Sequence, residues 1–233
     1  MLSRLRRALA SAVPAPLRRM VRPSGIAQLA TTPVSTQWGF DRGTPVDRWY
    51  IERFLTEHAG DIRGRALEVR NADYVVRFGT GVVRADVLDI DATNPRATIV
   101  ADLTAADHVS PALFDCFVLT QTLQFIYDVS AAIRHAHRLL APGGVLLATL
   151  PVVSRIAPRY GLDVDYWRFT AAGCRRLFGD VFGEEHVEVE TRGNVLACMA
   201  FLEGAALEEI GEEKLAVDDP YHPLIVTVRA LKR

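Results

Sequence analysis

The stretch that decides the fold is Ala97–Pro151, ATIVADLTAADHVSPALFDCFVLTQTLQFIYDVSAAIRHAHRLLAPGGVLLATLP. Two apolar runs, 114–120 and 145–150, flank a helical pattern over 130–140, and Pro142-Gly143-Gly144 is a helix-stop signal between them. Strands with such continuous apolar character are buried on both faces. A buried strand, a helix and a second buried strand in this order predict half of a parallel α/β sheet.

The alternation continues on both sides of this stretch. The remaining strands are predicted at 66–69, 82–90, 97–101, 187–190 and 224–231, and helices at 45–58, 74–78, 171–178 and 195–210. Thr44 is the expected N-cap of the first helix, with Pro45 at its first position. The last strands alternate polar and apolar residues, which favours an antiparallel edge. The predicted fold is α/β: a doubly wound, mostly parallel, Rossmann-like seven-stranded sheet with an antiparallel edge strand.

Composition narrows the function classes. The chain has 233 residues, 49% of them hydrophobic, and a formal net charge of −1, so nothing global favours nucleic acid as a partner. Three dispersed cysteines suit a reducing compartment, and no apolar run approaches the length of a membrane span, so we expect a cytoplasmic protein. Residues 1–37 form a basic leader and 38–233 the α/β domain. The leader is interpreted as a flexible tail or as a peripheral membrane or protein contact.

Polar residues follow several of the predicted strands. In an open α/β sheet, ligands bind beyond the carboxyl ends of the strands. This rule selects the residues after four strands: Glu68, Val69, Arg70 and Asn71; Asp89; Asp102 and Leu103; Thr120 and Gln121. Asp89 lies about twenty residues beyond the first loop, where an acid is well placed to bind a ribose diol. Asp86 and Asp91 are the alternatives for that role.

These features together resemble a family. Asp102-Leu103, Phe114-Asp115 and Arg138-Leu139-Leu140-Ala141-Pro142-Gly143-Gly144, followed by Asp165–Thr170, look like the core of class I S-adenosylmethionine-dependent methyltransferases of the small-molecule type. The sequence is similar to those of bacterial methyltransferases that are found beside glycosyltransferases. The resemblance implies S-adenosyl-L-methionine as cofactor and a small-molecule or glycan-precursor acceptor. It also implies Glu68 near the methionine end, Asp89 on the ribose, Asp102 on the adenine with Leu103 against its ring, and Thr120 and Gln121 along the cofactor.

The sequence departs from the family pattern in two places. The loop after the first strand, Glu68–Asp73, lacks the usual glycines, which permit positive φ and close backbone approach. Gln124-Phe125 stands where many relatives have histidine, so no general base is identified. Gln124, Tyr127, Asp165, Tyr166 and Arg168 are the candidates to face the acceptor. The sequence suggests no metal site, because His135 and His137 are two apart on a helix.

Each candidate also has a structural interpretation. Glu68 would pair with Arg70 or Arg77, Asp102 and Asp115 would cap backbone amides, and Asp86 would pair with Arg84. Tyr166, Trp167 and Phe169 would pack in the core or a lid. At the level of the whole chain, the enzyme hypothesis stands beside a catalytically inactive methyltransferase-fold scaffold, which the altered loop would explain.

Overall fold

The sheet expected from the sequence is present. The computed structural model describes residues 30–157 and 161–233. In the described residues, the sheet has seven strands in the order β3-β2-β1-β4-β5-β7-β6. Their bounds are β1 Gly64–Val69, β2 Val82–Asp89, β3 Ile99–Val100, β4 Phe114–Thr120, β5 Leu140–Pro151, β6 Val187–Arg192 and β7 Ile225–Leu231. Strands β1 to β5 pair in parallel, while β7 runs antiparallel to both β5 and the edge strand β6. The predicted fold class is confirmed.

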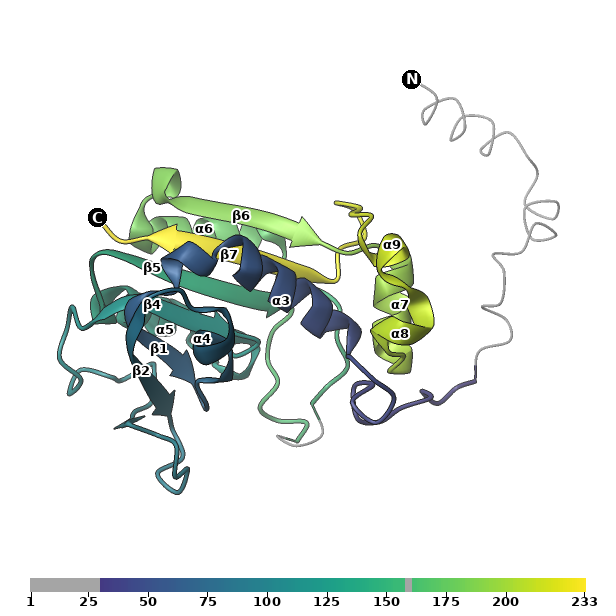
Figure 1. The fold of residues 1–233 in the computed structure, drawn as a ribbon, viewed down its shortest axis with the longest axis horizontal. Helices are drawn as coiled ribbons and strands as arrows, with labels where there is room; N and C mark the ends of the chain where they lie inside the picture. The colour runs from purple at the N-terminus through teal and green to yellow at the C-terminus, as the bar shows by residue number, and fades with distance from the viewer. Residues whose placement is uncertain (1–29, 158–160) are drawn as a thin grey trace. The chain divides into compact units, whose positions relative to one another are not determined.

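Helices cover both faces of this sheet (Figure 1). Their bounds are α3 Val46–Glu57, α4 Asp73–Phe78, α5 Val129–Leu139, α6 Ala171–Phe182, α7 Val195–Glu203, α8 Leu207–Ile210 and α9 Glu212–Leu215. Short 3-10 turns lie at Ala59–Asp61, Leu123–Phe125 and Glu184–His186. One core cluster joins α5 and α6 to the sheet through side chains such as Ile133 and Phe178. A second joins α3, α4, α7 and α9 to the opposite face through side chains such as Phe54 and Phe201.

Two features of the C-terminal part differ from expectation. The helix predicted over 195–210 ends at Glu203, because Gly204 takes a left-handed φ of +72° and stops it. A Cβ at Gly204 would lie 2.5 Å from the carbonyl oxygen of Ser35, so the chain needs glycine where this helix meets residue 35. The chain then continues as the short helices α8 and α9. Strand β5 begins at Leu140, so Pro142-Gly143-Gly144 lies inside the strand and not before it.

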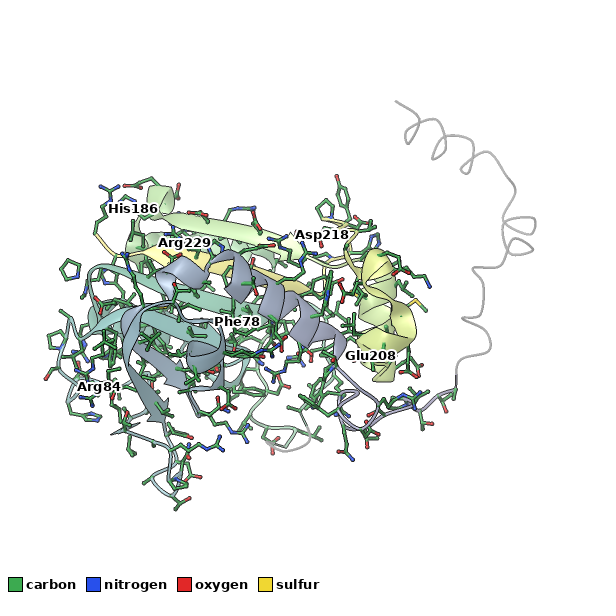
Figure 2. The ribbon with its side chains drawn as sticks, in the orientation of Figure 1. Phe78, Arg84, His186, Glu208, Asp218 and Arg229 are labelled. Carbon is green, nitrogen blue, oxygen red and sulfur yellow. The ribbon has the colours of Figure 1, made fainter. Side chains whose placement is uncertain are left out.

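The start of α3 also differs. Thr44 does not cap the helix, which has Pro45 at its N-cap and no side-chain capping bond. The Thr44 amide and hydroxyl instead donate to the carboxylate of Glu208 on α8, at 2.9 and 2.8 Å (Glu208 is labelled in Figure 2). This contact fixes the entry to α3, the helix whose first turn reaches the functional site.

Most of the predicted leader lies outside the described residues, so its partner contact stays a prediction. Residues 34–37, which the sequence assigns to the leader, belong to the compact unit 34–233. Ser35 is buried and its amide donates to the carbonyl of Glu203 at 3.1 Å. No helix in the described part of the chain is long and apolar enough to cross a membrane.

Candidate active site

A cavity of about 410 Å³ lies beyond the carboxyl ends of β1, β2 and β4. This is where strand order reverses between β1 and β4, the usual ligand position in such sheets. We call it the strand-end cavity. Nine of its lining residues are the nine that the sequence selected: Glu68, Val69, Arg70, Asn71, Asp89, Asp102, Leu103, Thr120 and Gln121. The fold therefore brings all nine together; what they bind stays a prediction.

Glu68 is the buried carboxylate of this cavity. It is 3% exposed at the end of β1, and it accepts the amides of Val75 at 2.8 Å and Tyr74 at 3.3 Å. Burial raises the pKa of Glu68 to about 7, although these amide bonds oppose the shift. The pairing with Arg70 or Arg77 is not what is seen: Arg77 pairs with Glu52 at 2.6 Å.

Of the three acids on and after β2, Asp89 alone lines the strand-end cavity. Asn94 holds it by donating to Asp89 Oδ2 at 2.6 Å, and the same amide donates to the carbonyl of Arg70 at 2.8 Å. Asp86 is fully buried in ion pairs with Arg65 and Arg84, as its structural interpretation predicts. Asp91 instead closes a turn by accepting from Thr93.

Asp102 and Leu103 form the end of the cavity after β3. Asp102 Oδ1 accepts the amide and hydroxyl of Thr104, both at 2.8 Å, which fixes the orientation of the carboxylate. Leu103 is 4% exposed and supplies an apolar surface beside it. Asp115, the other acid considered, caps the amide of Arg65 at 2.8 Å and lies at the start of β4.

The loop after β1, which has no glycine, nevertheless adopts a backbone conformation that glycine would favour. Arg70 has a φ of +74°, in the left-handed region that an L side chain adopts at a cost of roughly 1–2 kcal/mol. Asn71, the residue that tolerates this region best, is not the one that occupies it. The altered loop thus keeps the turn and accepts local strain, which is typical of functional sites.

We therefore expect opposite results from two glycine substitutions. Arg70→Gly relieves the left-handed strain and leaves the free energy of unfolding unchanged or raises it by up to about 1 kcal/mol. Ala85→Gly, the control inside strand β2 and outside the cavities, lowers it by roughly 0.5–1 kcal/mol. Urea unfolding of both variants measures the difference. An equal loss in the free energy of unfolding would show that the backbone at Arg70 is not strained.

A second cavity, of about 340 Å³, lies between the start of α3, the 121–125 turn and the loop before α6. We call it the helix-side cavity. It shares Arg48, Arg70, Gln121 and Phe125 with the strand-end cavity, so the two adjoin. Among the described residues with left-handed φ other than glycine, Trp38, Arg70 and Gln121 line it, and only Ala112 does not.

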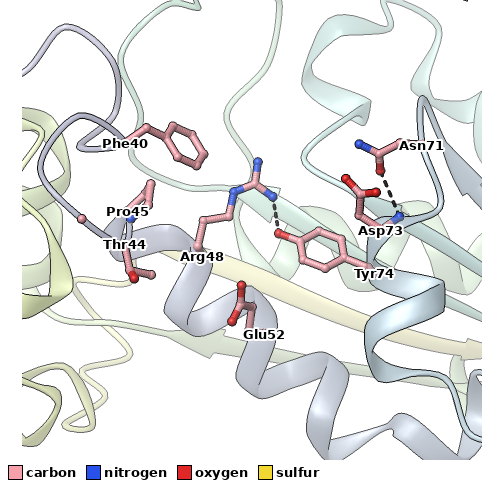
Figure 3. Close-up of a pocket in the computed structure, with 9 residues that line it drawn as sticks. Phe40, Thr44, Pro45, Arg48, Glu52, Asn71, Asp73 and Tyr74 are labelled. Carbon is pink, nitrogen blue, oxygen red and sulfur yellow. Dashed lines mark hydrogen bonds between the residues drawn. The ribbon is translucent and has the colours of Figure 1, made fainter.

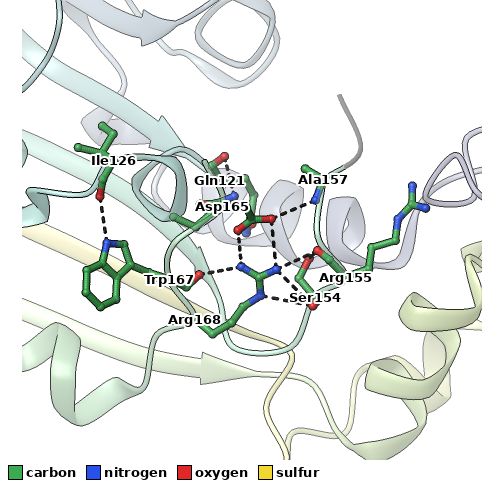
Figure 4. Close-up of polar contacts among 9 residues, drawn as sticks. Gln121, Ile126, Ser154, Arg155, Ala157, Asp165, Trp167 and Arg168 are labelled. Carbon is green, nitrogen blue, oxygen red and sulfur yellow. Dashed lines mark hydrogen bonds and ion pairs between the residues drawn. The ribbon is translucent and has the colours of Figure 1, made fainter. Parts of the chain in front are cut away.

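The helix-side cavity contains three of the five predicted acceptor residues: Gln124, Asp165 and Arg168. Asp165 pairs with Arg168 at 2.6 Å and accepts the amide of Ala157 at 3.0 Å (Figure 4). Tyr127 and Tyr166 do not line it. Tyr127 is 71% exposed and meets Tyr166 and Trp167 in an aromatic cluster, whose Trp167 indole donates to the carbonyl of Ile126.

Sequence reasoning missed Asp47 and Arg48 in the first turn of α3. Arg48 lines both cavities and a third, of about 440 Å³, toward Phe40 and Pro45. Its guanidinium donates to the Tyr74 hydroxyl and lies 5.7 Å from the centre of the Phe40 ring (Figure 3). The signal available was weak, because charged residues at the start of an amphipathic helix are normally solvated.

Solved structures with this fold include several methyltransferases. The [4+2]-cyclase SpnF is 16% identical with a TM-score of 0.52, covering 87% of each chain. An S-adenosylmethionine-dependent methyltransferase from Mesorhizobium loti is 16% identical with a TM-score of 0.50, covering 80% of this chain and 100% of that one. Phosphoethanolamine N-methyltransferase 2 of Haemonchus contortus, in complex with S-adenosyl-L-methionine, is 14% identical with a TM-score of 0.51, covering 79% and 52%. At these identities the likeness shows the fold.

Sequence comparison decides the family. No curated protein matches the chain. The family model described as "Methyltransferase domain" matches residues 36–181, which include α3, strands β1 to β5, the lining of the strand-end cavity and, apart from Phe201, the lining of the helix-side cavity. This match spans more than half of the sequence, and the chain therefore belongs to the methyltransferase domain family.

Proposed function

We propose that this protein is an S-adenosyl-L-methionine-dependent methyltransferase that acts on a small-molecule acceptor. The observation that carries the proposal is the strand-end cavity, where a buried, a partly exposed and an exposed carboxylate (Glu68, Asp89 and Asp102) meet apolar side chains in a member of the methyltransferase domain family. Its volume is within the usual range for small-ligand sites. The bound cofactor supplies an electrophilic methyl group.

The residues present fit the cofactor from one end to the other. Glu68 and Arg48 offer opposite charges for the ammonium and carboxylate of its amino-acid part. Asp89, held by Asn94, faces the cavity where a ribose diol would donate to it. Asp102 and the apolar Leu103 suit an exocyclic amine and a flat aromatic ring.

The helix-side cavity is the place for the acceptor, because it adjoins the strand-end cavity through four shared residues. Aromatic side chains of Trp38, Phe40 and Phe125 and the polar Gln124 line it. Such a mixture suits a small polar molecule or a glycan precursor. The protein contributes alignment of the acceptor and exclusion of water, which supply much of the rate of a displacement reaction.

Calorimetric titration with S-adenosylhomocysteine tests the proposal. We expect binding with a stoichiometry of one, weakened at least tenfold by Asp89→Ala because the carboxylate that faces the ribose is lost. Asp91→Ala is the matched control, since Asp91 lies two residues further on but outside the cavity. No heat at millimolar ligand would reject the cofactor and favour the scaffold hypothesis. The cyclase that shares this fold shows why the fold alone does not decide the reaction.

A further inference from the structure

Two residues that line the helix-side cavity carry buried acceptor atoms without hydrogen-bond donors among the described residues. Buried side-chain polar atoms almost always have hydrogen-bond partners. Asp47 Oδ1 and Gln124 Oε1 have none among the described residues, and both residues line this cavity. Gln124 is only 6% exposed, and its amide nitrogen already donates to the carbonyl of Gln121 at 3.0 Å. Both vacant positions are acceptors, so a ligand that completes them must bring hydrogen-bond donors.

The charges around Asp47 favour a neutral donor. The charged residues that line the same cavity are Arg48 on the same helix, Arg70 after β1, and Asp165 and Arg168 before α6. Asp165 and Arg168 neutralise each other in their ion pair. The remaining charges are Asp47, Arg70 and Arg48, of which Arg48 is taken up by the carboxylate of the cofactor under the proposed function. The methyl-donating cofactor would bring a positive sulfonium, so an ammonium ligand would add to an excess of positive charge. A hydroxyl group donates without adding charge.

We propose that the methyl acceptor is a hydroxyl compound bound in the helix-side cavity, and that Asp47 is the catalytic residue that accepts its hydroxyl proton. The inference rests on the proposed function. The acceptor oxygen forms a bond to the methyl carbon, the carbon–sulfur bond of the cofactor breaks with its electron pair left on sulfur, and the proton passes to the Asp47 carboxylate. Gln124 Oε1 accepts from a neighbouring donor of the acceptor and orients it.

The environment of Asp47 supports this role. Burial raises the pKa of Asp47 above its ordinary value, while the Arg48 charge and the backbone amides of Arg48 and Asp47 oppose the shift. A carboxylate whose burial outweighs its donors is a stronger base and a better match to a hydroxyl proton. Because the folded-state pKa is raised, the ionised group costs stability at pH 7, and this cost disappears as the pH falls below the unfolded value near 4.

Two like-for-like substitutions test the assignment without any acceptor. We expect Asp47→Asn to raise the melting temperature by roughly 3 °C at pH 7 and to lose this gain by pH 4. Asp165→Asn, the same change in the same cavity, should lower the melting temperature because it breaks a buried ion pair. If Asp47→Asn is destabilising like the control, the Asp47 carboxylate only stabilises the N-terminus of α3, and the proposal is wrong.

A binding experiment tests the acceptor class. Saturation-transfer NMR on the protein saturated with S-adenosylhomocysteine compares erythritol with 1,4-diaminobutane, a polyol and a diamine with equal carbon chains. We expect contact with erythritol that Asp47→Ala and Gln124→Leu each abolish. Preference for the diamine, or no difference between wild type and the variants, overturns the proposal. Failure of S-adenosylhomocysteine itself to bind would instead reject the proposed function.

Discussion

Glu68→Gln is expected to make the protein more stable at pH 8 and the cofactor bind less tightly. The folded-state pKa of Glu68 is about 7 and its ordinary value is 4.5, so the carboxylate costs stability above pH 4.5 and the cost is complete above pH 7. The difference corresponds to on the order of 3 kcal/mol. Glutamine can accept only one of the two backbone amides that Glu68 accepts, which costs about 1 kcal/mol. We therefore expect the variant to gain about 1–2 kcal/mol in the free energy of unfolding at pH 8, and to lose about 1 kcal/mol at pH 4.

Urea unfolding between pH 4 and 8 measures this gain, and calorimetry measures the loss of function. A cationic ammonium beside Glu68 favours its ionised form, so binding at pH 6.5 releases a proton in the wild type and none in Glu68→Gln. Titrations in two buffers with different heats of ionisation give the number of protons released. We expect the affinity for S-adenosylhomocysteine to fall at least tenfold, and the affinity for adenosine, which lacks the amino-acid part, to stay unchanged. A variant less stable than wild type at pH 8 would show that Glu68 is satisfied by its two amide donors.

Arg48→Ala should have the largest effect on cofactor binding. The guanidinium lines the strand-end cavity and is held by Tyr74, so it is positioned before the ligand arrives. Truncating one partner of a desolvated charge pair costs about 2–5 kcal/mol, which is roughly 30-fold or more in affinity. Calorimetry with S-adenosylhomocysteine should show this loss, again with no change for adenosine.

Arg53→Ala is the control for Arg48→Ala. Arg53 lies on the same helix, 4.8 Å from the Trp49 ring centre, and lines none of the cavities described. It should bind S-adenosylhomocysteine like wild type. An equal loss for adenosine in Arg48→Ala would mean that Arg48 supports the shape of the cavity and does not bind the carboxylate.

The sequence was a good guide to the strand ends because their pattern is local. Apolar runs and stop signals place β1, β2 and β4, and the topology rule then collects Glu68, Asp89 and Asp102 at one edge. The choice of Asp89 over Asp86 and Asp91 agrees with the lining of the cavity. The end of α7 at Gly204 was not predictable in the same way, since it depends on a contact with Ser35, about 170 residues away.

The contribution of α3 was missed for a related reason. Asp47 and Arg48 look like solvated residues of a helix start, and only the packing of α3 beside the strand ends turns them toward the cavities. The Arg70 conformation was missed because a sequence shows which residues tolerate positive φ, not which one the fold forces into it. Residues that depend on long-range packing or accept strain are those most often found at functional sites.

The position of β7 determines when the sheet can be completed during synthesis on the ribosome. Of the seven strands in the described residues, β7 is made last, yet it lies between β5 and β6 and pairs with both. Until residues 225–231 leave the exit tunnel, β5 presents an unpaired apolar border and β6 has no neighbour to join. Nascent chains stalled before that point would therefore hold every predicted ligand residue and still lack a complete sheet, a state whose exposed strand edges favour chaperone capture.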